Sequence, residues 1–212
     1  MALLVLMISV CYVAGSIPTS IIVSKLLRGI DIRDRGSFNA GATNVYRVLG
    51  LAPAILVSAV DVGKGLVAVL VLSRIGEAGP LNRDWVQIIA GLAAMAGHVW
   101  TVFAGFRGGK GVNTAAGVLV ALAPWATLIG LLVWLVVTFI TRYVSVGSMS
   151  AAVALPVVLV VERFVLGRAV SAQVLVLGCV AGMLILITHR SNIARLLRGE
   201  ENRFGRPRRS AT

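Results

Sequence analysis

The stretch VNTAAGVLVALAPWATLIGLLVWLVVTFIT, residues 112 to 141, decides the fold of this chain. A helix needs ~20 apolar residues to cross the hydrocarbon core of a membrane, so the stretch is long for one span and short for two. Pro124 and Trp125 lie near its middle, where the chain can turn. A single span and a hairpin of two short helices place every later segment on opposite sides of the membrane. The choice between them therefore sets the topology.

The rest of the sequence is typical of an all-α integral membrane protein. Hydrophobic residues make up 58% of the chain and charged residues 13%, and the mean hydropathy is +0.94. These values lie beyond those of a soluble domain of this length. Besides the stretch above, the apolar runs that indicate membrane spans are Ala2 to Ser24, Leu51 to Ser73, Trp85 to Phe103, Gly147 to Val161 and Val170 to Thr188.

The basic residues favour the hairpin, because cytoplasmic connections of membrane proteins carry an excess of Lys and Arg. With one span across residues 112–141, the Arg-rich end of the chain would lie outside. With a hairpin, 15 of the 20 Lys and Arg residues fall in cytoplasmic segments, four lie outside and Lys64 lies within a span. The sequence therefore predicts seven transmembrane helices, with the N-terminus outside and the C-terminus in the cytoplasm.

The net charge of +12 does not point to nucleic acid. The basic residues stand at the ends of apolar segments and in a short tail, where membrane orientation and lipid headgroups account for them. We expect no nucleic-acid partner, a single transmembrane domain over residues 1–205, and a basic, disordered cytoplasmic tail over residues 206–212. Cys11 and Cys179 lie inside apolar runs without metal-ligand spacing, and we assign both to the core.

A glycine-rich basic loop, GFRGGKGVNT at residues 105 to 114, precedes the hairpin. Glycines such as Gly108 and Gly109 let backbone N–H groups turn toward an anion, Lys110 adds charge, and the following helix offers its positive end. The spacing differs from that of a P-loop, in which Ser or Thr follows the lysine. The loop is typical of a site for a phosphate smaller than a nucleotide.

A second cytoplasmic segment, residues 31 to 50, combines mixed charges with small polar residues. Ser37 or Asn39 can cap a short helix in which Asn44 and Arg47 share one face. On its own, the segment fits a capped interfacial helix with solvated arginines equally well. The density of Ser, Asn and Thr beside Arg47 favours a cationic, hydrogen-bonding site.

Two more cytoplasmic segments carry polar groups that fit the same site. Ser145 and Ser148 lie where a helix enters the membrane, and they serve there either as caps or as ligands of an anion. His189 and Asn192 stand three apart at the end of the last span and therefore project from one helical face. A histidine at an interface often has no chemical role. His189 lies where the other loops must converge, so it can bind substrate or orient a reacting group.

The polar residues inside the spans leave two alternatives open. Asp61 and Lys64 are one helical turn apart, and they either neutralise each other in the hydrocarbon region or meet the substrate. His98 ends the third span, and it either serves the glycine-rich loop or marks the membrane interface.

Several catalytic patterns are absent from the sequence. Neither histidine is followed by an aspartate five positions later, as the usual glycerolipid acyltransferase dyad requires. There is no Gly-x-Ser-x-Gly elbow, no acidic cluster for magnesium and no two-histidine metal spacing. We expect no metal or other cofactor, and we infer that any reaction uses an already activated substrate.

Seven motifs follow one another along nearly the whole chain: Gly15-Ser-Ile-Pro18, Gly36 to Arg47, Asp61-Val-Gly-Lys-Gly65, Gly97-His98, Phe106 to Gly111, Arg142 to Ser148 and His189-Arg-Ser-Asn192. In this order they resemble the motifs of the bacterial PlsY family of acyl-phosphate:glycerol-3-phosphate acyltransferases. Phe38 and Ala40 differ from the residues that are most common at these positions of the family motif. Neither residue is assigned a role.

The resemblance implies a seven-helix enzyme of the bacterial inner membrane whose active site faces the cytoplasm. It implies transfer of a fatty acyl group from acyl phosphate to the sn-1 hydroxyl of glycerol 3-phosphate, which yields lysophosphatidic acid and phosphate in the first committed step of phospholipid synthesis. The expected partners are the two substrates and membrane lipid, with the upstream acyl-phosphate-forming enzyme as a candidate. Together with the loops, the resemblance gives the expected site: catalytic His189, Asn192 and Ser37, and substrate-binding Arg47, Asn44, Lys110, Gly108, Gly109, Ser145 and Ser148.

A small anion transporter and a membrane scaffold are the competing hypotheses. Asp61, Lys64 and helices interrupted by glycine are also transporter features, but the polar motifs of this chain cluster at one membrane face and not at the midplane. A scaffold without chemistry leaves the concentration of Ser, Asn, Gly and Arg unexplained.

Cysteine labelling tests the orientation that the charge distribution predicts. A cysteine placed near Pro80 is expected to react with an impermeant thiol reagent added from outside, and one near Gly36 only with reagent added from inside. Reaction of both cysteines from the same side would refute the seven-span arrangement.

Overall fold

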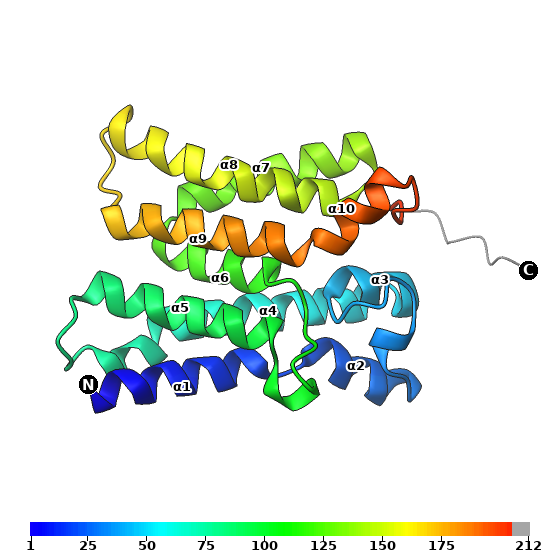
Figure 1. The fold of residues 1–212 in the computed structure, drawn as a ribbon, viewed down its shortest axis with the longest axis horizontal. Coiled ribbons are helices and arrows are strands. Elements are labelled where there is room, and N and C mark those ends of the chain that lie inside the picture. The colour runs from blue at the N-terminus through cyan, green and yellow to red at the C-terminus, as the bar shows by residue number, and fades with distance from the viewer. Residues whose placement is uncertain (205–212) are drawn as a thin grey trace, which may run out of the picture.

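The computed structural model describes residues 1–204, and this part of the chain folds into helices without strands (Figure 1). The α-helices are α1 (Ala2–Ser16), α2 (Thr19–Arg28), α3 (Ala42–Leu49), α4 (Leu51–Leu70), α5 (Arg83–Val99), α6 (Val112–Leu122), α7 (Pro124–Thr141), α8 (Val144–Phe164), α9 (Ala172–Thr188) and α10 (Arg190–Leu197). Short 3-10 helices lie in the connections: η1 (Ile32–Asp34), η2 (Leu72–Gly76) and η3 (Val102–Ala104). The predicted all-α class is confirmed. The predicted tail, residues 206–212, lies outside the described residues.

The helices form two layers joined through α6 (Figure 1). One layer contains α1, α4 and α5, the other contains α7, α8 and α9, and α6 packs closely on α4 and also contacts α7 and α9. The largest group of buried apolar side chains includes Val69, Ile88, Val118, Leu155 and Leu177, which come from α4, α5, α6, α8 and α9. A shared core therefore holds the two layers together.

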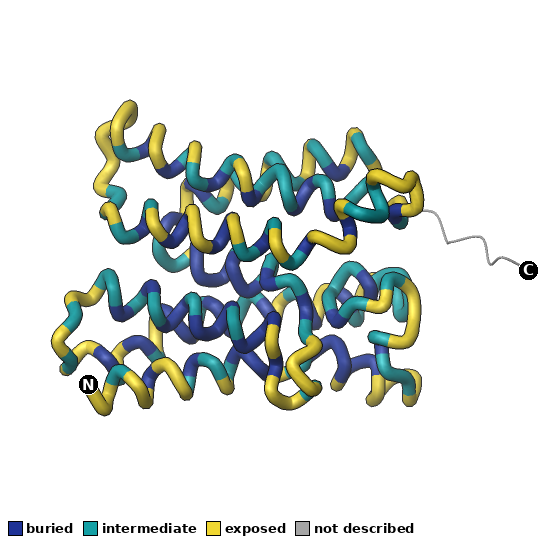
Figure 2. The backbone as a smooth tube through the Cα atoms, viewed as in Figure 1, coloured by how far each residue is buried: buried dark blue, intermediate teal, exposed yellow. Residues whose placement is uncertain are grey.

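The outward faces of the helices are apolar. Leu131, Leu135 and Phe139 of α7 are 50%, 47% and 74% exposed, and Figure 2 shows exposed residues recurring along the outer sides of the helices. Water disfavours such extensive apolar surface, whereas lipid does not. The chain is an integral membrane protein.

The described helices offer five or six candidate spans, whereas the sequence predicts seven. Five helical segments of the described chain are long and apolar enough to cross a membrane, and a sixth is obtained if α9 and α10, which are bent by 53°, count as one. Helix α6 is apolar but has only 11 residues. The count of seven spans, the orientation of the termini and the single domain over residues 1–205 therefore stay predictions.

The stretch at 112–141 forms two helices, as expected, but the two differ in length, with 11 residues in α6 and 18 in α7. Helix α6 ends at Leu122 and α7 begins at Pro124, whose missing N–H suits the first position of a helix. The prediction of two short helices is wrong for α7, because its 18 residues suffice to cross a membrane. The break at Ala123 leaves only α6 short.

The first apolar run is also broken, at Ile17 and Pro18. Ile17 has a φ of −55° and a ψ of 113°, outside the helical region, as expected for a residue that precedes proline. Helices α1 and α2 therefore form one candidate span with a break in it.

Most of the segments that carry the polar motifs lie toward one end of the molecule, and the glycine-rich loop reaches them from nearer the middle, at the end of α5 (Figure 1). Helices α3 and α10 lie at this end, near the last described residues, whereas the N-terminus and the connection from α8 to α9 lie at the opposite end. The structure thus gathers the motif segments on one face, as the sequence predicted.

Two glycines of α4 test how closely α4 and α6 approach each other. A Cβ added at Gly65 would lie 2.2 Å from the Thr114 carbonyl oxygen, whereas one added at Gly63 has no heavy atom within 4 Å. Gly65→Ala is expected to destabilise the protein by ~1–3 kcal/mol through overpacking. Gly63→Ala, its matched control, is expected to be neutral or to stabilise by up to ~1 kcal/mol. Thermal unfolding in detergent measures both, and equal midpoints for the two variants would contradict the close helix contact.

Candidate active site

A buried carboxylate, Glu201, lies among the polar groups at this end of the molecule. Its side-chain oxygen Oε1 accepts hydrogen bonds from Asn192 Nδ2 at 2.7 Å and from Ser145 Oγ at 2.9 Å, and Oε2 accepts one from Arg195 Nε at 2.7 Å. Glu201 is only 8% exposed. The carboxylate therefore ties the start of α8 and helix α10 to the segment that follows α10.

Lys110 joins this group from the glycine-rich loop. Its Nζ donates a hydrogen bond to Asn192 Oδ1. Burial lowers the pKa of Lys110 to about 8, Glu201 partly offsets the shift, and the charges of Arg195 and Arg47 add to it. We call Lys110, Ser145, Asn192, Arg195 and Glu201 the Glu201 cluster.

Arg47 reaches the same region from α3. Its Nη2 donates to the Asn202 carbonyl oxygen at 3.4 Å, and the neighbouring Tyr46 ring stacks on Phe204 with 5.2 Å between the ring centroids. Burial lowers the pKa of the Arg47 guanidinium, and the nearby Glu201 opposes that shift. Residues 200–204, here called the C-terminal strap, therefore hold α3 close to the Glu201 cluster.

Asn44 shapes the loop that carries Ser37. Asn44 is 1% exposed, and its amide Nδ2 lies within hydrogen-bonding distance of three backbone carbonyl oxygens, those of Ile32, Arg35 and Asn39. Its Oδ1 accepts a hydrogen bond from the Ser37 backbone N–H at 2.7 Å. An amide has only two hydrogens, so this side chain keeps no free donor for a ligand. Asn44 positions Ser37 in this arrangement, and the substrate contact that we expected of Asn44 stays a prediction.

The helix caps expected from the sequence are not formed. Helix α3 has Gly41 at its N-cap and α8 has Tyr143, and neither makes a side-chain cap bond. The capping role proposed for Ser37 or Asn39 fails because Asn44 holds the chain before Gly41 in a non-helical turn.

Ser148 lies one helical turn beyond Ser145 and outside the Glu201 cluster. Its Oγ donates to the Val144 carbonyl at 3.0 Å and accepts from Trp134 Nε1 at 3.2 Å. The first bond lies within α8 and the second joins α7 to α8, so Ser148 holds the start of α8, which carries Ser145, and is not part of the cluster.

His189 lies at the 53° bend between α9 and α10, and it is 3% exposed. Its Nδ1 is 2.8 Å from the Ile185 carbonyl oxygen, which can only accept, so Nδ1 carries the hydrogen. In the neutral imidazole Nε2 then keeps its lone pair and can accept a hydrogen bond from a substrate hydroxyl.

Two backbone N–H groups of the glycine-rich loop, which we expected to bind phosphate, donate to the protein backbone instead. The backbone N–H of Gly108 donates to the Val99 carbonyl at 3.0 Å, and that of Gly109 donates to the His98 carbonyl at 3.1 Å. These amides satisfy carbonyls at the end of α5, which a helix leaves unpaired. Helix α6 has Gly111 as its N-cap and no side-chain cap. Its first backbone N–H groups, unlike those of Gly108 and Gly109, are therefore available to donate hydrogen bonds to an anion.

A pocket of about 210 Å³ lies beside this loop. Its polar lining includes Arg107, Lys110, Thr188, Arg190 and Ser191. Lys110 thus belongs both to the pocket and to the Glu201 cluster. Among the described residues, no three His, Cys, Asp or Glu side chains come together in a way that could hold a metal ion.

Sequence reasoning missed Glu201, Arg195 and Thr188, whose Oγ1 donates to the Lys110 carbonyl at 3.0 Å. A signal for Glu201 was present, because the chain has only eight acidic residues and two of them stand together in a basic segment. The sequence does not say which of the two is buried. Glu200 instead pairs with Arg198 at the surface.

Comparison with known proteins points to one family. The family model for glycerol-3-phosphate acyltransferase matches residues 5–199. The glycerol-3-phosphate acyltransferases of Chlorobium phaeobacteroides (strain BS1) and Chlorobaculum tepidum are 46% and 44% identical to this chain, and each alignment covers 94% of this chain and 96% of the relative.

Two solved structures are also similar. Both are of PlsY, an integral membrane glycerol 3-phosphate acyltransferase. The glycerol 3-phosphate form has a TM-score of 0.83 and 39% identity, over 95% of this chain and 96% of that one. The lysophosphatidic acid form has a TM-score of 0.81 and 38% identity, over 95% of each chain.

Glu201→Ala tests whether the buried carboxylate organises this end of the molecule. The variant leaves Arg195 without its ion-pair partner and leaves the buried donors of Ser145 and Asn192 without an acceptor, at about 1–3 kcal/mol for each unsatisfied group, so a large fall in the unfolding midpoint is expected. Glu200→Ala is the matched control, because exposed pairs contribute at most ~1 kcal/mol. Similar midpoints for the two variants would show that Glu201 does not hold the site together.

Proposed function

The chain belongs to the glycerol-3-phosphate acyltransferase family, and we propose that it takes its acyl group from an acyl phosphate and passes it to the sn-1 hydroxyl of glycerol 3-phosphate. The resemblance to the PlsY family is confirmed. The protein is an acyltransferase that acylates glycerol 3-phosphate to lysophosphatidic acid. The acyl donor, the acylated position and the roles of individual residues are our inference.

The observation that carries this proposal is the gathering of cations at one end of an apolar helix bundle. Lys110 and Arg195 belong to the Glu201 cluster and Arg47 lies beside it, and the adjoining pocket adds Arg107 and Arg190. Both proposed substrates carry a phosphate group, and charge-assisted hydrogen bonds from Lys and Arg are the strong contacts for phosphate. The pocket and the Glu201 cluster provide two adjacent cationic regions, one for each phosphate.

Acyl transfer from acyl phosphate to glycerol 3-phosphate requires the protein mainly to position the two substrates. An acyl phosphate is a mixed anhydride with a good leaving group. The substrate hydroxyl oxygen attacks the acyl carbon, a new C–O ester bond forms, the C–O bond to phosphate breaks, and inorganic phosphate leaves. The hydroxyl proton passes to a phosphate oxygen, so no protein nucleophile is required. Orientation of the two substrates and stabilisation of negative charge then supply the rate enhancement.

We propose that His189 and Asn192 orient the attacking hydroxyl. His189 Nε2 accepts a hydrogen bond, because Nδ1 is committed to the Ile185 carbonyl. Asn192 is fixed between Lys110 and Glu201, so its position follows that of the cationic groups. Ser37, held by Asn44, approaches the same end from the loop before α3.

We propose that the protein lies in the bacterial inner membrane, that its active site faces the cytoplasm, and that it receives acyl phosphate from the enzyme that forms it. The excess of Lys and Arg in the motif segments supports the cytoplasmic orientation. The transporter hypothesis is not supported, because the polar groups of the site lie at one end of the bundle.

Release of inorganic phosphate by the purified protein tests the donor. With palmitoyl phosphate and glycerol 3-phosphate, phosphate release is expected to require both substrates and to match the formation of 1-acyl-glycerol 3-phosphate. Activity with an acyl thioester in place of the acyl phosphate would contradict the proposed donor while leaving the family assignment intact.

The Lys110 ammonium gives a prediction about pH. Its pKa is lowered to about 8, so it carries its charge below that pH and loses it as the pH rises through 8. The kcat/KM for glycerol 3-phosphate is therefore expected to fall above about pH 8, and Lys110→Ala to lower it at least ~10-fold. Lys110→Arg keeps its charge at high pH and should move the fall upward. An unchanged alkaline limb in Lys110→Arg would exclude Lys110 as its origin.

A further inference from the structure

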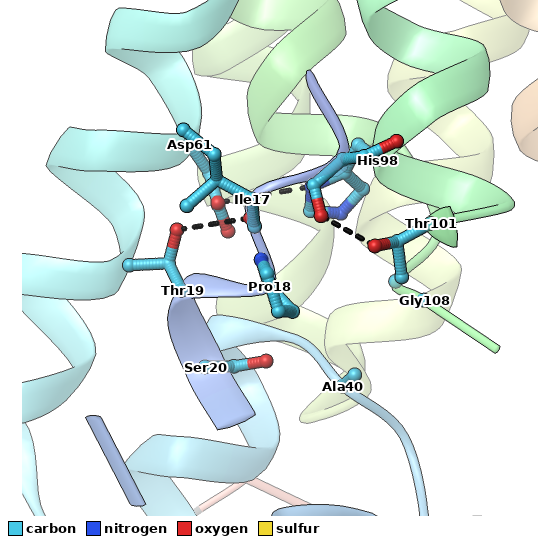
Figure 3. A pocket seen from close by; sticks show the side chains of 11 residues that line it. Ile17, Pro18, Thr19, Ser20, Ala40, Asp61, His98, Thr101 and Gly108 are labelled. Atoms are coloured by element: carbon cyan, nitrogen blue, oxygen red, sulfur yellow. Dashed lines mark hydrogen bonds and ion pairs between the residues drawn. The ribbon is translucent and has the colours of Figure 1, made fainter. Parts of the chain in front are cut away.

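A second buried group of charges lies next to the glycine-rich loop, and Figure 3 shows two of its residues, Asp61 and His98, together with Gly108 of the loop. Asp61 and Lys64 of α4 and His98 of α5 are 2%, 7% and 9% exposed. Lys64 Nζ donates to Asp61 Oδ1 at 2.6 Å and to the Ile17 carbonyl at 2.5 Å. His98 Nδ1 lies 3.7 Å from the same Asp61 oxygen. We call these three residues the Asp61 cluster.

The charges of the Asp61 cluster pair with one another, and within residues 1–204 they make no hydrogen bond or ion pair with the Glu201 cluster. Burying an ion pair costs several kcal/mol of desolvation per ion, and well-packed apolar residues would often be as stable in its place. Asp61 and Lys64 neutralise each other, so neither charge is buried alone. Neutralisation does not explain why the chain has two charged residues here, because two apolar residues would avoid the cost of burying charge. The contacts around the pair indicate what it holds in place.

The imidazole of His98 forms the surface on which the loop lies. A Cβ added at Gly109 would be 2.2 Å from His98 Nε2, and one added at Gly108 would be 2.1 Å from the His98 carbonyl oxygen. The loop approaches the end of α5 this closely only because both residues are glycines. The next residue along the chain is Lys110, so the contact at His98 sets the position from which Lys110 reaches Asn192.

The break between α1 and α2 meets the same cluster. Lys64 donates to the carbonyl of Ile17 at that break, and Thr101 Oγ1 donates to the carbonyl of Ser16. A polar pocket of about 10 Å³ lies between these groups, and Asp61 and His98 are part of its lining (Figure 3). The cluster thus joins three parts of the chain: the α1–α2 break, helix α4 and the end of α5 that holds the loop.

We infer that the Asp61 cluster positions the glycine-rich loop, with Asp61 and Lys64 orienting His98 and His98 fixing Gly109 and therefore Lys110. This inference rests on the proposed function only in taking Lys110 as a ligand of substrate phosphate. His98 is a positioning residue, because it acts through the loop and not on the substrate. The sequence left open whether His98 serves the loop, and the geometry answers that it does.

A double-mutant cycle with Lys110 tests the inference. In the otherwise unchanged protein, His98→Ala is expected to raise the dissociation constant for glycerol 3-phosphate at least ~10-fold, because displacement of a binding group by ~1 Å has effects of this size or larger. In a Lys110→Ala background the same substitution should raise it by less than ~3-fold, because the group that His98 positions is gone. His98→Gln, which restores polar reach toward Gly109, should recover part of the affinity.

Stability controls separate positioning from structural damage. Gly178→Ala disturbs the contact of α9 with α8, since its Cβ would lie 2.5 Å from Leu159 Cδ1, and it should lower the unfolding midpoint without changing affinity. If His98→Ala does not accumulate, Asp61→Asn takes its place in the cycle. Equal losses of affinity in both backgrounds, or loss of stability alone, would overturn the inference. Calorimetric binding is read separately from turnover, so a wrong acyl donor would leave this result unaffected.

Discussion

The arrangement of the candidate site depends on one buried carboxylate in a surplus of positive charge. Lys110, Arg47 and Arg195 come from different segments and would repel one another in a poorly solvated environment. Glu201 counters this repulsion by accepting hydrogen bonds from Arg195, Asn192 and Ser145. The basic groups are therefore held close together before any phosphate arrives. A substrate phosphate can then bind to a site that is already organised, with less loss of conformational entropy on binding.

Rigid elements support this arrangement from two directions. The C-terminal strap carries Glu201 across the end of the bundle and is fastened by the stacking of Phe204 on Tyr46. At the end of α5, His98 contacts and supports the glycine-rich loop that carries Lys110. Both supports rest on helices that contact each other through small residues, which is how membrane helices approach closely. Catalysis by positioning requires such support, because small displacements of a binding group have large effects on rate.

Features that depend on local composition could be predicted from the sequence. Contacts between segments that are distant along the chain could not. Apolar runs and basic connections gave the helical class and the gathering of the motifs at one end, and Pro124 marked the start of α7. The role of Asn44 was not predictable, because its partners are backbone carbonyls of a loop whose path depends on packing. Likewise, the amides of Gly108 and Gly109 bind the end of α5, which no spacing rule indicates. Glu201 was missed because only the tertiary structure distinguishes it from Glu200.

The claim that Glu201 holds the cations together is tested most directly by a double-mutant cycle between Arg195→Gln and Glu201→Gln, read as the free energy of unfolding. Each single variant leaves one charge of the 2.7 Å pair without its partner, whereas the double variant leaves neither. The account predicts that the double variant loses less stability than the sum of the single losses, with a coupling of about 0.5–3 kcal/mol. Additive losses would show that the two side chains do not depend on each other, and would contradict the account.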